Sequence, residues 1–157
     1  MLNKKKLYWY AQLIGWLVYV FIVGLFNKLN GSEISSELIY SLLSIYLIGI
    51  SISHFYRAII NKLHWMKYSL GLLVPRVLSS VFVLGIIIYL VQNVVLDVLI
   101  AHNSFEIDLV DAFPKVINWT LLLLLWSLFY FLFHFINNYK KEEIKNLKWQ
   151  AAKNEIE

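Results

Sequence analysis

The chain has 157 residues, of which 60% are apolar, 17% aromatic and 15% charged, with a net charge of +4 and no cysteine. Ordinary globular domains are about 45–50% apolar and about 25% charged, so this composition excludes a typical soluble domain. The missing cysteine excludes disulfides, thiolate catalysis and zinc–thiolate sites, and the basic residues form no single patch, so we expect no nucleic-acid partner. The apolar residues are concentrated in four blocks, which is typical of a protein that crosses the lipid bilayer several times.

The first expected span covers residues 7–26 and follows a basic N-terminus. Its apolar run of about 20 residues exceeds the roughly 7–15 apolar residues of a signal peptide, and no small-residue cleavage site follows it. We therefore interpret this run as a retained membrane helix.

A short polar turn leads to the second expected span, residues 38–56, which is rich in small residues. Small residues let helices approach closely in lipid, so this face is predicted to pack on a neighbouring helix. Alternatively, the serine hydroxyls bond to carbonyls of their own helix. The small residues are Ser41, Ser44, Gly49, Ser51 and Ser53.

Two further spans are expected at residues 77–96 and 116–136. Pro75 lies just before the third span, where a missing N–H costs little, and Pro114 opens the fourth. At about 1.5 Å per residue, the fourth apolar run is long enough to cross roughly 30 Å of hydrocarbon. The acidic segment 97–112 between these spans is too short to form a domain of its own.

Lysine and arginine are distributed unevenly between the two sides of these spans. The N-terminus, the segment 57–76 and the C-terminal tail hold twelve of the fourteen basic residues. The other two, Lys28 and Lys115, lie in the remaining loops together with six of the ten acidic residues. Under the positive-inside rule, this distribution predicts that both termini are cytoplasmic.

The tail, residues 138–157, contains no glycine or proline and consists mostly of good helix formers, so we expect one rod that continues the fourth span. A hinge near residues 137–143 would contradict this expectation. Residues spaced three and four apart form a possible coiled-coil seam along this rod: Asn137, Lys140, Ile144, Leu147 and Ala151. A competing seam through Trp149, Ala152 and Ile156 fits almost as well. Because only about two heptads are present, a parallel coiled-coil dimer and a solvated single helix both remain open.

Histidines are the candidate metal or haem ligands, and two of them, His54 and His134, fall near the cytoplasmic ends of their spans. Without a carboxylate at that depth they form a weak ligand set, so hydrogen bonding within the bundle is the better interpretation and no metal is expected. Arg57 shares a helix face with His54. It either contacts a ligand or, as we favour, extends to lipid phosphates.

Gln92 and Asn93 form the deepest polar pair and, with Asp97, are the best candidates for a sensing site open to the outside. The alternative is that the amides bond to another helix. Trp119 and Trp126 are one heptad apart and serve either in packing, which we favour, or in an aromatic ligand box. The sequence contains no phosphate-binding loop, nucleophile elbow or paired catalytic carboxylates, so no catalytic or cofactor-binding residue is expected in this chain.

Five short stretches stand out along the chain. They are Gln-Leu-Ile-Gly-Trp at 12–16, Ser-His-Phe-Tyr-Arg at 53–57, His-Trp at 64–65, Trp-Ser-Leu-Phe-Tyr-Phe at 126–131 and Asn-Tyr-Lys-Lys-Glu-Glu at 138–143. Together they resemble the membrane portions of LytS-type sensor histidine kinases of the four-span bacterial kind, and the resemblance is strongest at the exit from the fourth span.

This resemblance implies the input module of a homodimeric two-component kinase in the bacterial inner membrane, which passes a signal from the envelope or bilayer to a response regulator. In that family a phospho-accepting histidine and an ATP-binding domain follow the linker helix, and ATP and magnesium belong to that domain. The chain ends before the phospho-acceptor motif, so neither His54 nor His134 is expected to take that role, and the natural protein is expected to continue.

The expected architecture is an all-α, four-transmembrane-helix up-and-down bundle over residues 1–137, with a cytoplasmic linker helix over residues 138–157. Two other functions remain open at this point. One is a small self-contained transporter or lipid-binding membrane protein, although no acid stands in mid-span to couple protons. The other is an assembly subunit whose tail docks a partner.

Overall fold

The computed structural model describes residues 4–100 and 107–156, and all regular secondary structure in these two ranges is helical. A 3₁₀ turn, η1, connects the second and third helices, and a π-helical segment, η2, extends the third helix directly. The elements are α1 (Lys4–Leu29), α2 (Ser36–Lys62), η1 (Trp65–Lys67), α3 (Leu70–Asn93), η2 (Val94–Ile100) and α4 (Leu109–Ile156).

Local sequence signals account for several of the helix ends. Ser35 caps α2, because its hydroxyl accepts a hydrogen bond of 3.2 Å from the backbone N–H of Leu38. At the start of α4, the carboxylate of Asp108 accepts a bond of 2.8 Å from the N–H of Val110. His64 has a φ of 54°, and this left-handed conformation turns the chain between α2 and η1.

The third and fourth helices begin before the spans predicted at residues 77–96 and 116–136. α3 already begins at Leu70 and α4 at Leu109, so Pro75 and Pro114 are each the sixth residue of their helix. A proline removes one bond to the carbonyl four residues earlier. In both helices that earlier residue is exposed near the helix start, so one bond is lost and the helix continues. The third helix also runs past residue 96, because η2 carries it to Ile100.

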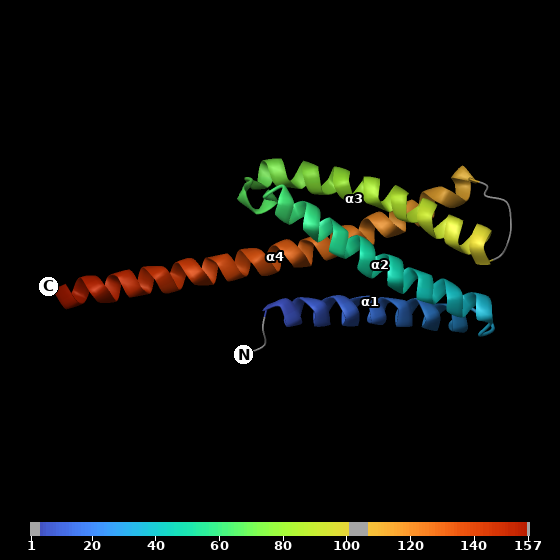
Figure 1. Cartoon of the computed structure of the whole chain (residues 1–157), viewed down its shortest axis with the longest axis horizontal. Helices are drawn as coiled ribbons and strands as arrows, with labels where there is room; N and C mark the ends of the chain where they lie inside the picture. Colours follow the sequence, from blue (N-terminus) through green and yellow to red (C-terminus); the bar gives the residue numbers. More distant parts are fainter. Residues whose placement is uncertain (1–3, 101–106, 157) are drawn as a thin grey trace.

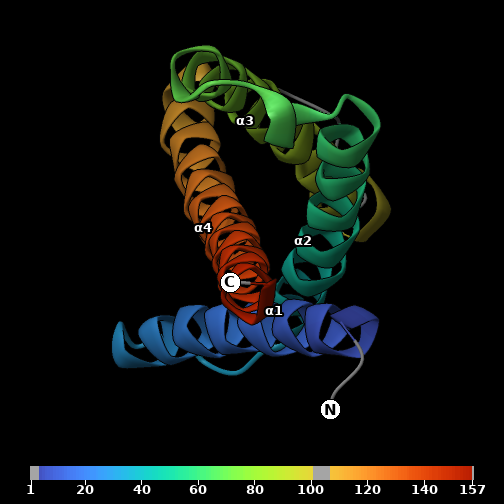
Figure 2. The same ribbon diagram turned by 90° about the vertical axis from the view of Figure 1, so that its left-hand side faces the viewer.

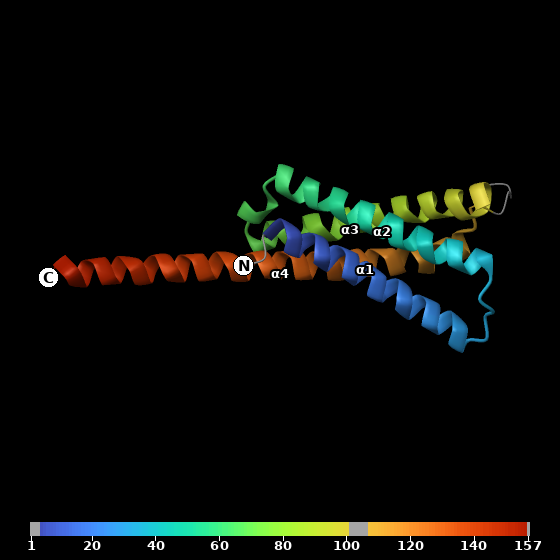
Figure 3. The same ribbon diagram turned by 60° about the horizontal axis from the view of Figure 1, so that its bottom comes forward.

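The helices are arranged with their connections at two opposite ends (Figure 1). The α1–α2 turn, the end of η2 and the start of α4 lie at one end, whereas the start of α1 and the α2–α3 turn lie at the other. α3 and α4 form the closest pair, α1 packs mainly on α2, and α1 lies at the edge of the bundle (Figure 2). The C-terminal part of α4 projects alone beyond the other helices (Figure 3).

The core is formed by side chains from all four helices and η1. Close helix contact depends on small residues at two positions. A Cβ on Gly49 would lie 2.4 Å from the Trp16 ring, and a Cβ on Gly85 would lie 2.4 Å from the Thr120 hydroxyl. The central buried residues are Trp16, Tyr56, Ile60, Trp65, Leu73, Val81, Ile88, Trp119 and Leu123.

Part of the serine- and glycine-rich stretch of α2 packs against α1, as the sequence predicted: Gly49 lies against Trp16, and Ser53 bonds with Trp16 and Gln12. Ser44 is buried as well, whereas Ser51 is exposed and bonds to the carbonyl of Leu47 in its own helix. Ser44 and Ser53 also bond to carbonyls of their own helix, so close packing and bonding to their own helix, the two interpretations offered by the sequence, both apply.

The outer surfaces of the bundle carry large exposed apolar side chains along each helix, among them Phe21, Phe26, Leu128 and Phe129. Such surfaces are far more apolar than the surface of a soluble monomer. Four helices in the described part of the chain are long and apolar enough to cross a membrane, which confirms the four apolar helical segments expected from the sequence.

Candidate functional site

α4 packs mainly on α3 and also reaches α1 and α2 through side chains. It is one uninterrupted helix of 48 residues, with no break at residues 137–143. Its N-terminal half buries one stripe against the bundle, whereas every residue from 138 to 153 is exposed. One rigid element therefore joins the packed bundle to a free segment. The buried stripe contains Val116, Trp119, Leu123, Ser127, Tyr130 and Phe131.

Among the described residues, side-chain hydrogen bonds connect α4 to each of the other three helices. The Trp119 indole N–H donates to the side-chain oxygen of Gln92 on α3 over 2.9 Å. The Asn118 amide donates to the hydroxyl of Tyr19 on α1 over 3.2 Å. The hydroxyl of Tyr130 donates to Asn61 on α2 over 3.0 Å.

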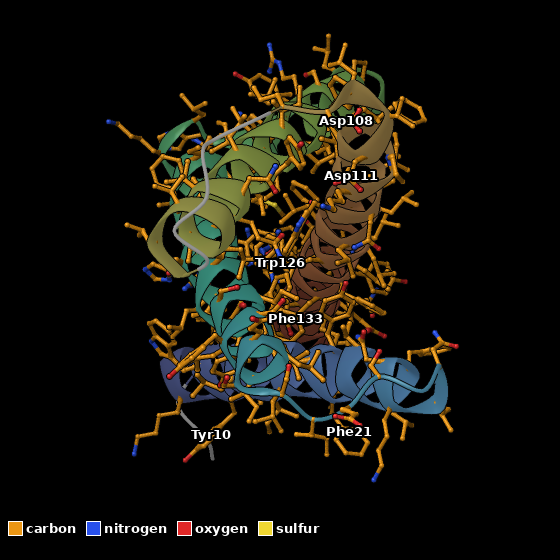
Figure 4. The ribbon with its side chains drawn as sticks, turned by 90° about the vertical axis from the view of Figure 1, so that its right-hand side faces the viewer. Tyr10, Phe21, Asp108, Asp111, Trp126 and Phe133 are labelled. Atoms are coloured by element: carbon orange, nitrogen blue, oxygen red, sulfur yellow. The ribbon has the colours of Figure 1, made fainter. Side chains whose placement is uncertain are left out.

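Aromatic rings add a second set of contacts to α4. The ring of Trp119 lies 6.0 Å from that of Trp16, and Trp126 lies 5.9 Å from the buried Tyr56. Trp126 also stacks on Tyr130 at 5.2 Å, one turn further along α4. Figure 4 shows Trp126 in the interior of the bundle, whereas Tyr10 and Phe21 point away from it on α1. The two tryptophans proposed from the sequence are therefore packing residues here.

A polar cluster joins α1 to α2 through Ser53. The Trp16 indole N–H donates to the Ser53 hydroxyl over 3.1 Å, and that hydroxyl lies 2.8 Å from the side-chain oxygen of Gln12. All three side chains are buried, and the Gln12 amide donates onward to the hydroxyl of Tyr8 over 3.2 Å. Because lipid offers no partner for such groups, this network fixes how α1 sits on α2.

The cluster continues to Arg57 and His54 near the N-terminal end of α1. The guanidinium of Arg57 lies 3.7 Å above the Tyr8 ring, and the Tyr8 hydroxyl lies 3.4 Å from His54 Nδ1. The His54 ring also stacks on Trp9 at 5.1 Å. Arg57 therefore makes a cation–π contact across the helix interface, and its Nε is buried with no hydrogen-bond partner in the described part of the chain.

The other residues proposed from the sequence occupy different parts of the bundle. Asn93 is buried, and Gln92 is bonded to Trp119 on α4. The side chain of Asp97 lies outside the described residues. His134 packs against Tyr130 at 4.6 Å and also contacts Phe133, and no group of three or more possible metal ligands occurs among the described side chains.

The five proposed seam residues lie along the projecting part of α4. Asn137 is half-buried at the end of the bundle, whereas Lys140, Ile144, Leu147 and Ala151 are exposed. The competing seam through Trp149 and Ala152 is exposed as well. Neither seam has a partner within the single described chain.

Sequence reasoning missed several residues that form the interface. Several of them are polar or amphipathic side chains within apolar stretches, and that setting is the signal by which they are recognisable. Gln12 and Trp16, for example, are four residues apart on one face of α1. The missed residues are Tyr8, Gln12, Trp16, Tyr19, Asn61 and Asn118.

The fold and this interface indicate a class: an all-helical protein with the four apolar helices of a multi-pass membrane protein. No family model matches the chain, and neither a curated protein nor a solved structure matches it.

Proposed function

We propose that the chain is the membrane input module of a two-component sensor histidine kinase of the LytS type. The observation that carries this proposal is the continuity of α4 from the packed bundle into the exposed tail. A stiff helix transmits rotation or translation along its length, and a rearrangement of the bundle would therefore reach a cytoplasmic kinase domain. ATP and magnesium would bind that kinase domain, and a response regulator would receive the phosphoryl group.

In this proposal the four helices form an up-and-down bundle in a bacterial inner membrane with both termini in the cytoplasm. Two observations support this orientation. Twelve of the fourteen basic residues lie in the N-terminus, the segment 57–76 and the tail. The start of α1, the α2–α3 turn and the projecting tail also share one end of the molecule (Figure 1).

The signal would act by favouring one of two packings of α4 against the other helices. About 5.5 kcal/mol is needed to move a population from 1:99 to 99:1. Hydrogen bonds between membrane helices contribute about 0.6 kcal/mol each on average, so the bonds of α4 to Gln92, Tyr19 and Asn61 together contribute about 2 kcal/mol to the balance between the two packings. The signal itself must supply the larger amount through its different affinity for the two packings.

The tail would pair with the tail of a second copy. Ile144 and Leu147 are each more than half exposed in the single chain, and a parallel helical dimer would cover them. Polar Asn137 and Lys140 would lie in the same seam near the membrane. Their poor fit in an apolar seam would keep two helix arrangements close in free energy.

Cysteine cross-linking in native membranes tests this proposal directly, because the chain has no cysteine of its own. Single variants Ile144→Cys, Leu147→Cys and Ala151→Cys should form disulfide-linked dimers efficiently. Trp149→Cys and Ala152→Cys test the competing seam in the same assay. Equal cross-linking at all five positions, or none at any, would contradict a defined parallel seam.

A further inference from the structure

A groove of about 610 Å³ lies between α2 and α3 beside η1. Its wall is mostly aliphatic and aromatic, and its polar groups gather at the end formed by η1 and the start of α3. The lining comprises Phe55, Tyr56, Ile59, Leu63, Trp65, Tyr68, Arg76, Ser79, Ser80, Val83, Leu84 and Ile87.

The polar end of the groove carries uncompensated positive charge. The Arg76 guanidinium lies 3.9 Å above the Tyr68 ring, and this contact holds it at the mouth. Residues 38–96 include four basic residues and no acidic residue, and Arg76 has no ion-pair partner among the described side chains. A guanidinium with free donors is well suited to a phosphate.

The rest of the groove suits a hydrocarbon chain. The hydroxyls of Ser79 and Ser80 already donate to carbonyls of their own helix, so neither needs a polar ligand. The lining runs along α3 from Arg76 to Ile87, which is about 16 Å for eleven steps of 1.5 Å. That length matches one leaflet, which is about 15 Å thick.

We infer that this groove binds one anionic phospholipid of the cytoplasmic leaflet, with its phosphate on Arg76 and an acyl chain along Val83 and Ile87. The assignment to the cytoplasmic leaflet depends on the proposed orientation of the chain, so this part of the inference rests on the proposed function. The site lies close to α4, because Tyr56 lines the groove and its ring also contacts Trp126 at 5.9 Å. A lipid in the groove would therefore contact Tyr56, which itself contacts the helix proposed to carry the signal.

Native mass spectrometry of the purified chain, loaded with equal amounts of phosphatidylglycerol and phosphatidylcholine, tests the site. The wild-type chain should retain phosphatidylglycerol about fivefold more than phosphatidylcholine, the ratio expected for one basic residue near an anionic headgroup. Arg76→Gln should abolish this preference. Lys28→Gln removes the same charge at the other end of the bundle and should leave the preference unchanged.

A second pair of variants tests the acyl-chain part of the groove. Val83→Trp should fill the groove and reduce retention of both lipids, whereas Leu78→Trp, on an exposed part of α3 outside the lining, should not. Equal retention of the two headgroups by the wild-type chain, or a preference that survives in Arg76→Gln, would overturn the lipid site and leave the input-module proposal standing. Tail cysteines that never cross-link would overturn that proposal and leave a measured headgroup preference intact.

Discussion

The indole N–H of Trp119 in α4 donates a hydrogen bond of 2.9 Å to Gln92 in α3, two residues before the π-helical segment η2 begins. The same indole ring contacts Trp16 of α1, so three helices meet at one side chain. π-helical turns are rare and occur frequently at functional sites. This pair therefore offers a direct route from the end of α3 to α4.

Replacing Trp119 by phenylalanine should destabilise the bundle by about 1 kcal/mol, because the Gln92 oxygen would lose its donor. Denaturant titration in detergent, followed by the loss of helical circular dichroism, measures the change. Trp149→Phe is the matched control, since Trp149 is exposed in the tail, and it should unfold like the wild type. Equal stabilities of the two variants would show that the Gln92 bond contributes nothing.

Gly85→Ala should separate α3 from α4. The new methyl group would lie 2.4 Å from the Thr120 hydroxyl and 3.1 Å from the carbonyl oxygen of Val116. Overpacking of this kind costs about 1–3 kcal/mol, measurable in the same titration. Gly15→Ala is the control, because nothing lies within 4 Å of its added Cβ and alanine is the better helix former.

The double variant of Gly85→Ala with Thr120→Ala should recover part of the lost stability. It removes the closest clashing atom but keeps the contact with the Val116 carbonyl. A double variant no more stable than Gly85→Ala alone would place the strain at the backbone of α4.

Tyr8→Leu should loosen α1 from α2 by about 1–2 kcal/mol. The variant removes the ring beneath the Arg57 guanidinium and the hydroxyl that accepts from Gln12. Protease sensitivity and denaturant titration both report this change. Tyr10→Leu is the control, since Tyr10 is more than half exposed, and an equal effect of the two variants would contradict the role assigned to Tyr8.

Substituting leucine for both Asn137 and Lys140 in the proposed full-length kinase should lock signalling in one state. Leucine would make the seam uniformly apolar and favour a single helix register. Autophosphorylation in membrane vesicles, measured with and without the stimulus, provides the readout. An unchanged response to the stimulus would count against a seam held between two states by these polar residues.

Lys140→Pro should uncouple the tail from the bundle. A proline inside a helix costs about 3 kcal/mol or more, and residue 140 lies beyond the packed part of α4. The bundle should therefore unfold as in the wild type, while the cross-linking pattern at residues 144, 147 and 151 changes. A kinase that still responds normally with this substitution would show that α4 does not act as a lever.

The sequence alone predicts the four apolar helices, because the length and hydrophobicity of a segment are local properties. An apolar segment in lipid must also satisfy its own backbone hydrogen bonds, which a helix does. The continuity of α4 through residues 137–143 follows in the same way from the lack of glycine and proline. The starts of the third and fourth helices could not be read from the sequence in this way. Pro75 and Pro114 lie in the second turn of their helices, and a proline so close to an exposed helix start does not end the helix.

Only the tertiary structure decided which side chains meet. The Gln92 amide was recognisable as a buried polar group, but its partner lies 27 residues away on another helix, and nothing local specifies the rotation of α4 that brings Trp119 to it. The contact of Arg57 on α2 with Tyr8 on α1 likewise joins two helices whose residues are far apart in the sequence. In a chain with apolar residues on every helix face, hydrophobic periodicity does not distinguish inward from lipid-facing positions, so close packing and interhelical hydrogen bonds determine the arrangement.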